Sequence, residues 1–136
     1  MRVAVTGATG TIGRAVVGAL KSRGDDVTAL SRSAPGTETW ADPKAAPPPT
    51  DALRGRDAVV HLLGEQIAQR WTDDARREIR DSRILSTRNL VTALGELPEG
   101  ERPGVLISQS GAGWYGHRGD ETQPAEQPTV ERATVG

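Results

Sequence analysis

Apolar residues along the chain form short continuous runs that alternate with helix-spaced patterns. The first run, Arg2 to Thr6, is rich in Val and Ala and ends at a glycine-rich turn, which is typical of a strand buried on both faces. The apolar pattern that follows repeats every three to four residues and predicts a helix capped at Gly24. Its predicted inner face comprises Ile12, Ala15, Val16, Ala19 and Leu20.

Four further runs predict the remaining strands. They cover Asp26–Leu30, Thr37–Trp40, Asp57–Gly64 and Val105–Ser108. Strands that alternate with helices and are joined by right-handed crossovers form a doubly wound parallel sheet. We therefore predict an α/β fold of the Rossmann type, with strand order 3-2-1-4-5 and no strand after the fifth.

A long helix is predicted over Asp73–Leu94, with Thr72 as its N-cap. Its predicted inner face comprises Ala75, Ile79, Ser86, Leu90 and Leu94. The segment from Ser33 to Arg56 has no sustained periodicity and contains the run Pro47 to Pro49. Proline cannot occupy a helix interior or a central strand, so we expect a surface connection there without a regular helix.

Composition narrows the function classes. A chain of 136 residues corresponds to about one domain, and with no Phe its core must consist of Val, Leu, Ile and Ala. A net charge of −1 without a basic run excludes an electrostatic site for nucleic acid or an anionic membrane. The absence of Cys excludes disulfides, thiolate metal sites and a Cys nucleophile. The N-terminus lacks a signal-peptide core, so we expect a cytoplasmic protein.

The glycine-rich turn "TGATGTIG" is the first candidate site. Gly7, Gly10 and Gly13 follow the first strand and open the first helix. In a dinucleotide site the first glycine forms the tight turn, the second lets the backbone approach a pyrophosphate, and the third allows close helix packing. The phosphates bind N–H groups at the start of the helix, here those of Thr11 and Ile12. A purely structural turn is the alternative, because tight turns use glycine whatever they bind.

The residues after the second strand indicate which dinucleotide would bind. An NAD site has an Asp or Glu there, which accepts a hydrogen bond from the ribose 2′-hydroxyl. This chain has Ser31 and Arg32 instead. A hydroxyl and a guanidinium suit a 2′-phosphate, so NADP(H) is predicted in preference to NAD(H). Alternatively, Arg32 is a solvated loop charge.

Four segments together resemble a known family. They are "VTGATGTIGR", "SRSAPGTETW", "AVVHLLGEQIAQRWTDDARREIRDSRILSTRNLVTAL" and "LISQSGAGWYG". The sequence is similar to an atypical branch of the extended short-chain dehydrogenase/reductases, within the NAD-dependent epimerase/dehydratase superfamily and described as nucleoside-diphosphate-sugar epimerases. The resemblance covers nearly all of residues 1–121. It implies proteins about twice this length, whose C-terminal substrate lobe has no counterpart in these 136 residues.

The resemblance implies a set of cofactor contacts. They are Gly7, Thr9, Gly10, Thr11 and Ile12 in the turn, Ser31 and Arg32, then Leu62, Leu63 and Gly64 beside the nicotinamide ribose. Arg83 matches a position that faces the cofactor in relatives, although it also fits a solvated helix charge. His61 lies inside an apolar run, which favours a core histidine over a catalytic base. Trp40 and Trp71 are interpreted as packing residues.

Ser110 matches the catalytic serine or threonine of the family, which hydrogen-bonds the substrate oxygen. The family's Tyr-x-x-x-Lys pair is missing, because the only tyrosine is Tyr115 and the lysines are Lys21 and Lys44. Tyr115 either donates the proton itself or serves as an aromatic plug in its turn. His117 and Asp120 are interpreted as solvated loop residues.

These observations predict an NADP-binding Rossmann domain over residues 1–116 and a polar, mobile tail over residues 117–136. Three functions remain: an NADP(H)-dependent oxidoreductase or epimerase with Ser110 at the substrate oxygen, a catalytically inactive dinucleotide-binding module, or an interaction protein without a nucleotide. A sheet that ends at its fifth strand has an open edge, so self-association or marginal stability is also expected.

Overall fold

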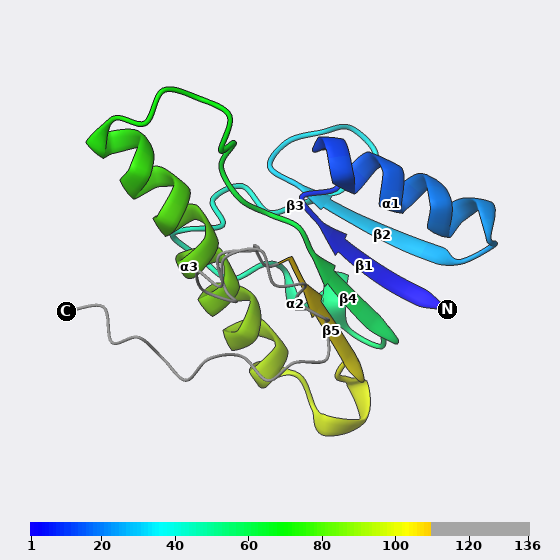
Figure 1. Cartoon of the computed structure of the whole chain (residues 1–136). Helices are drawn as coiled ribbons and strands as arrows, with labels where there is room; N and C mark the ends of the chain where they lie inside the picture. The colour runs from blue at the N-terminus through cyan, green and yellow to red at the C-terminus, as the bar shows by residue number, and fades with distance from the viewer. Residues whose placement is uncertain (110–136) are drawn as a thin grey trace, which may run out of the picture.

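The computed structural model describes residues 1–109, which fold as a parallel sheet flanked by helices (Figure 1). The sheet is completed by β5, the last element of this part of the chain. In chain order the elements are β1 (Arg2–Thr6), α1 (Thr11–Ser22), β2 (Asp26–Ser31), β3 (Glu38–Thr39), α2 (Thr50–Leu53), β4 (Ala58–His61), α3 (Asp73–Glu96), the 3-10 helix η1 (Glu99–Glu101) and β5 (Val105–Ser108).

The strands are all parallel and lie in the order β3-β2-β1-β4-β5, as the sequence predicts. The register places Thr6 at the end of β1 between Leu30 of β2 and His61 of β4. Ser108 of β5 is the next partner of His61. The carboxyl ends of the central strands therefore lie side by side.

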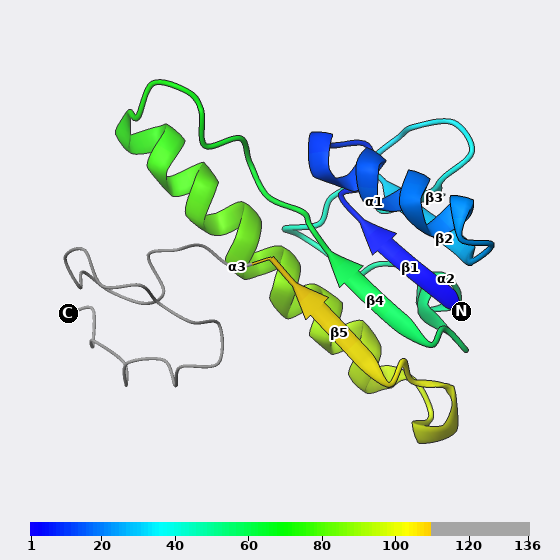
Figure 2. The same cartoon turned by 45° about the vertical axis from the view of Figure 1, so that its right-hand side comes forward.

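The two long helices cover opposite faces of the sheet (Figure 2). On the α3 face the core includes Ala4 and Val59 of the sheet with Leu90 of α3. On the α1 face Val3 and Val5 pack with partly buried residues of α1, namely Val17 and Leu20. Side chains along β1 point alternately to the two faces of the sheet and so contribute to both clusters, which explains why this strand is apolar at every position between its ends.

The face that α1 buries differs from the predicted one. Ile12 is 50% exposed, and Ala15 and Ala19 are exposed as well. The buried side instead contains Gly13, with Val17 and Leu20 packed against the sheet. The contact at Gly13 fixes the rotation of the helix about its axis, and this turns the predicted stripe by about one position.

The connection between β3 and β4 contains one element that the sequence analysis did not expect. α2 is a single turn of four residues whose Leu53 is fully buried. Trp40 is buried in the same cluster, as predicted, and its indole N–H donates to the Ala46 carbonyl at 2.8 Å. Trp71, also interpreted as a packing residue, is instead 56% exposed, and its indole N–H donates to the Ile67 carbonyl.

α3 starts where its capping signal predicts. The Thr72 hydroxyl accepts a hydrogen bond from the Ala75 N–H at 3.1 Å, and Asp73 and Asp74 occupy the first turn. The helix extends two residues beyond the predicted Leu94, to Glu96. None of the helices within residues 1–109 combines the length and the apolar character needed to cross a membrane.

Candidate functional site

A cleft of about 450 Å³ lies at the carboxyl ends of β1, β2 and β4. The strand order changes direction between β1 and β4, and such a switch point is where open α/β sheets bind ligands. Most of the predicted cofactor residues line this cleft. They are Gly7, Thr9 and Gly10 after β1, Ser31 and Arg32 at the end of β2, and Leu62, Leu63 and Gly64 after β4.

Two glycines of the turn are required by the packing. Gly7 has φ +68°, and a Cβ there would lie 2.9 Å from the backbone of Leu62. A Cβ on Gly13 would overlap the Gly7 carbonyl oxygen and the backbone of Ala8. Gly13 therefore lies behind the cleft, where it allows α1 to approach β1, and it does not line the cleft itself.

Gly10 has a different environment, because a Cβ there would meet only the Gly7 carbonyl oxygen, at 3.4 Å. Gly10 is the N-cap of α1, with no side-chain capping bond and no acidic residue in the first turn. The N–H groups of Thr11 and Ile12 thus begin a helix that has no acidic residue in its own first turn, and this favours a phosphate there. The side chains of both residues are exposed and do not line the cleft.

Ser31 and Arg32 contribute to the cleft in different ways. The Ser31 hydroxyl accepts from the Ala34 N–H at 2.8 Å and lies 2.7 Å from the Thr37 hydroxyl. Since Thr37 donates to the Ala34 carbonyl, Ser31 is the donor to Thr37 and shapes the loop. Arg32 is exposed, and within residues 1–109 no carboxylate lies at ion-pair distance from it.

Arg83 of α3 reaches the end of β4, beside the cleft. Its guanidinium donates to the Ile79 carbonyl at 2.9 Å and to the Glu65 carbonyl at 3.0 Å. A Cβ on Gly64 would lie 2.8 Å from the guanidinium carbon, so a larger residue there would displace the Arg83 side chain. Arg83 is thus a partly buried residue and not the solvated helix charge that the sequence also allowed.

Arg83 does not line the first cleft, but it lines a second cavity of about 370 Å³. The two cavities are neighbours, since Leu62 and Leu63 line both. The other lining residues of the second cavity are His61, Ile67, Thr87, Ser108 and Gln109. Ser108 and Gln109 immediately precede the predicted catalytic serine. Ser110 and Tyr115 themselves lie outside the described residues, as do His117 and Asp120.

His61 is a hydrogen-bonded core residue, as the sequence favoured. It is 3% exposed, with Nδ1 2.7 Å from the Thr6 hydroxyl and Nε2 3.1 Å from the Thr87 hydroxyl. Burial lowers the pKa of His61 to about 4, so the imidazole is neutral at pH 7. A neutral ring with both nitrogens engaged joins β1, β4 and α3, and it is a poor catalytic base.

Several residues of the cleft were missed by sequence reasoning. They are Ala41, Asp42, Pro43 and Lys44 of the segment after β3, Glu65 after β4, and Glu78 and Ser82 of α3. The segment after β3 has no periodicity that would reveal its position. The position of Glu78 could have been suggested by its neighbour Ile79, which belongs to the predicted inner face of the long helix.

The sequence and the fold are similar to those of known proteins. Residues 3–134 match the family described as NAD dependent epimerase/dehydratase family. The chain belongs to this family. One relative is an epimerase family protein of Arabidopsis thaliana, the chloroplastic SDR39U1 homolog, which is 36% identical to this chain over 124 residues. The match covers 85% of this chain and 36% of the relative.

Two solved structures are also similar. The crystal structure of human epimerase family protein SDR39U1 (isoform 2) with NADPH has a TM-score of 0.77 at 32% identity and covers 97% of this epimerase/dehydratase-family chain. A nucleoside-diphosphate sugar epimerase from Corynebacterium glutamicum has a TM-score of 0.70 at 36% identity and covers 95%. The chain spans 44% of the human structure and 26% of the bacterial one, and thus less than half the length of either protein or of the plant relative.

Proposed function

We propose that this chain binds NADP(H) and contributes the coenzyme-binding part of an oxidoreductase or epimerase that transfers hydride at a hydroxyl or carbonyl carbon. The observation that supports the proposal is the composition of one cleft. The uncapped N-terminus of α1, the Arg32 side chain and the backbone after β4 all border the same 450 Å³ space. The solved human relative described with NADPH adds support for a dinucleotide.

The residues present fit such a coenzyme. In the proposed arrangement the N–H groups of Thr11 and Ile12 bind the pyrophosphate, because Gly10 leaves the approach to the helix open. Arg32 binds the 2′-phosphate, and the backbone from Leu62 to Gly64 borders the nicotinamide ribose. When bound, the coenzyme supplies a hydride donor or acceptor.

The same proposal assigns the substrate oxygen to Ser110, whose hydroxyl would hold it by a hydrogen bond. The second cavity, which includes Ser108 and Gln109, is the part of the described structure next to this serine. Replacing Ser110 with Ala should lower kcat in any hydride-transfer assay while leaving NADPH affinity unchanged. Equal turnover by both proteins would remove Ser110 from the mechanism.

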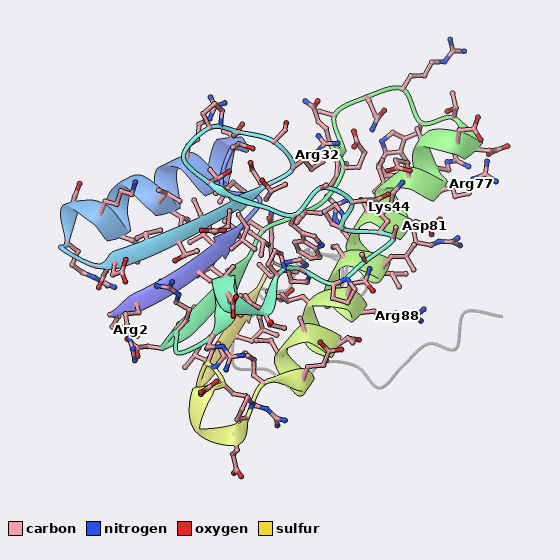
Figure 3. All side chains as sticks on the ribbon, turned by 180° about the vertical axis from the view of Figure 1, so that it is seen from behind. Arg2, Arg32, Lys44, Arg77, Asp81 and Arg88 are labelled. Atoms are coloured by element: carbon pink, nitrogen blue, oxygen red, sulfur yellow. The ribbon has the colours of Figure 1, made fainter. Side chains whose placement is uncertain are left out.

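Calorimetry with NADPH tests the coenzyme assignment. Arg32→Ala should weaken NADPH binding by about 10- to 100-fold, because a charge-assisted hydrogen bond contributes about 1.5–3 kcal/mol. Arg88→Ala is the matched control, since Arg88 lies on the outer side of α3 and away from Arg32 (Figure 3). Equal losses for the two variants would count against the assignment.

The second candidate is a dinucleotide-binding module without catalysis. The observation that favours it is that these 136 residues contain one tyrosine, Tyr115, which neither lysine follows at the Tyr-x-x-x-Lys spacing. Tight NADPH binding without turnover on a panel of carbonyl compounds and sugar nucleotides would favour this module, and turnover would exclude it. A cytoplasmic location and a domain spanning residues 1–116 remain predictions.

A further inference from the structure

Lys44 is a charged residue of the cleft that no motif revealed. It belongs to the segment between β3 and α2 and lines the cleft together with Arg32. Its Nζ lies 2.8 Å from both carboxylate oxygens of Glu78 in α3. Figure 3 shows Arg32 and Lys44 toward the end of α3 that begins at Asp73, with Arg88 farther along the helix.

The backbone around Lys44 is held on both sides. The Asn89 side-chain amide donates to the Pro43 carbonyl at 2.9 Å and to the Lys44 carbonyl at 3.1 Å. The Asp42 carboxylate accepts from the N–H groups of Lys44 and Ala45. The Asn89 bonds fasten the segment to α3 and the Asp42 bonds fix its turn, so the ammonium group extends from a well-held backbone.

The charges of the cleft show why this ammonium matters. Among residues 1–109 its lining contains three carboxylates, Asp42, Glu65 and Glu78, and two cations, Arg32 and Lys44. A hydrogen bond to the Glu78 carboxylate raises the pKa of Lys44 and so favours its charged form. Without Lys44 the Glu78 carboxylate would lose its ion pair, and one more uncompensated negative charge would disfavour a 2′-phosphate, which carries close to two negative charges.

We propose that Lys44 is a specificity-determining residue: by pairing with Glu78 it offsets a carboxylate of the cleft that Arg32 also lines, so that the cleft accepts the additional charge of NADP(H) in preference to NAD(H). The proposal rests on the proposed function, because it names how the same site distinguishes two coenzymes. Selectivity is expected because NADP(H) differs from NAD(H) only by the 2′-phosphate, whose negative charge is sensitive to the charge of Lys44.

The test compares the affinities of the purified chain for NADPH and for NADH by calorimetry. Lys44→Met should weaken NADPH binding about tenfold and change NADH binding less than twofold, since only NADPH carries the additional charge. Lys44→Arg should retain most of the NADPH preference. Lys21→Met is the matched control, because Lys21 lies in the last turn of α1 and is the only other lysine.

Salt provides a second measurement on the same proteins. The NADPH affinity of the wild type should fall with ionic strength more steeply than that of Lys44→Met, because one charge contact is missing in the variant. Circular dichroism of each variant establishes that the fold is retained.

Two results would overturn the inference. One is an equal loss of NADPH and NADH affinity in Lys44→Met, which would make Lys44 only a loop anchor. The other is an unchanged NADPH affinity in a wild type that does prefer NADPH, which would leave the proposed function intact and remove Lys44 from it. A wild type that binds neither coenzyme would instead refute the proposed function, and the inference with it.

Discussion

Among the single residues of the core, His61 has the largest consequence for pH. Its ring is buried between Thr6 and Thr87, and this environment lowers its pKa from 6.5 to about 4. The unfolded chain therefore binds a proton between pH 6.5 and pH 4 that the folded chain does not bind. The free energy of unfolding must then decrease as the pH falls through this range.

We expect full stability above about pH 6.5 and a loss of about 3 kcal/mol by pH 4, from a shift of roughly 2.5 pKa units at 1.36 kcal/mol each. Urea denaturation at a series of pH values measures the decrease, and NMR titration of the imidazole measures the pKa directly. A free energy of unfolding that stays constant between pH 4.5 and pH 6.5 would contradict the prediction.

Two carboxylates with lowered pKa values act below this range, and the second histidine can be replaced. The N-terminal ammonium lowers the pKa of Asp25 by a hydrogen bond, and the Arg2 backbone N–H lowers that of Asp57. The stabilisation that these carboxylates provide is lost only below their ordinary pKa of 3.8. His117→Gln is the control for the only other histidine, and it should leave the decrease in place.

At the scale of elements, α1 contains a matched pair of glycines. Gly13 touches the β1–α1 turn, whereas a Cβ on Gly18 would meet no atom within 4 Å. Gly13→Ala should lower the free energy of unfolding by about 3 kcal/mol, at the upper end of overpacking costs. Gly18→Ala should raise it by about 0.5–1 kcal/mol, because alanine favours the helix.

Urea denaturation of the two variants checks this prediction. If Gly13→Ala is too unstable to purify, Gly18→Ala still tests by itself the expected gain from the higher helix propensity of alanine. Equal stabilities of the two variants would mean that α1 does not approach β1 as closely as the overlap at Gly13 requires.

The sequence predicted elements better than it predicted faces. β1 and β5 have the predicted bounds, because continuous apolar runs between turn residues leave few alternatives. The buried face of α1 could not be predicted from spacing, since the contact at Gly13 decides the helix rotation and glycine contributes nothing to an apolar pattern. Trp71 shows the same limit, because a large apolar side chain indicates a contact without saying which segment provides it.

The candidate site divides in a similar way. The glycine turn, Ser31 and Arg32 could be located from the sequence because they directly follow apolar strands. Lys44 and Glu78 could not, because they come together only when the segment after β3 packs against α3. Their sequence separation of 34 residues carries no local signal.

At the scale of the whole molecule, β5 is an edge strand of the described sheet whose residues are all exposed. Within residues 1–109 it pairs only with β4, and Val105, Leu106 and Ile107 are 49%, 41% and 54% exposed. An open apolar strand edge is a template for pairing with another chain. We therefore predict concentration-dependent self-association of the 136-residue chain.

Sedimentation velocity over a range of concentrations measures this association. Ile107→Lys should shift the equilibrium toward the monomer, because charges on edge strands oppose pairing. Ile84→Lys is the matched control on α3, where Ile84 is 42% exposed and distant in sequence from β5. A wild type that stays monomeric with high thermal stability would contradict the prediction.

The contact between Gly7 and Leu62 determines where this site can change. Because a single methyl group at Gly7 would strike the backbone after β4, the floor of the cleft is fixed by the main chain and tolerates almost no substitution. The charged rim, with exposed Arg32 and partly exposed Lys44, has no such constraint. Engineering of coenzyme preference in this fold should therefore succeed at the rim. New side chains there can change which coenzyme binds without affecting the main chain at the floor of the cleft.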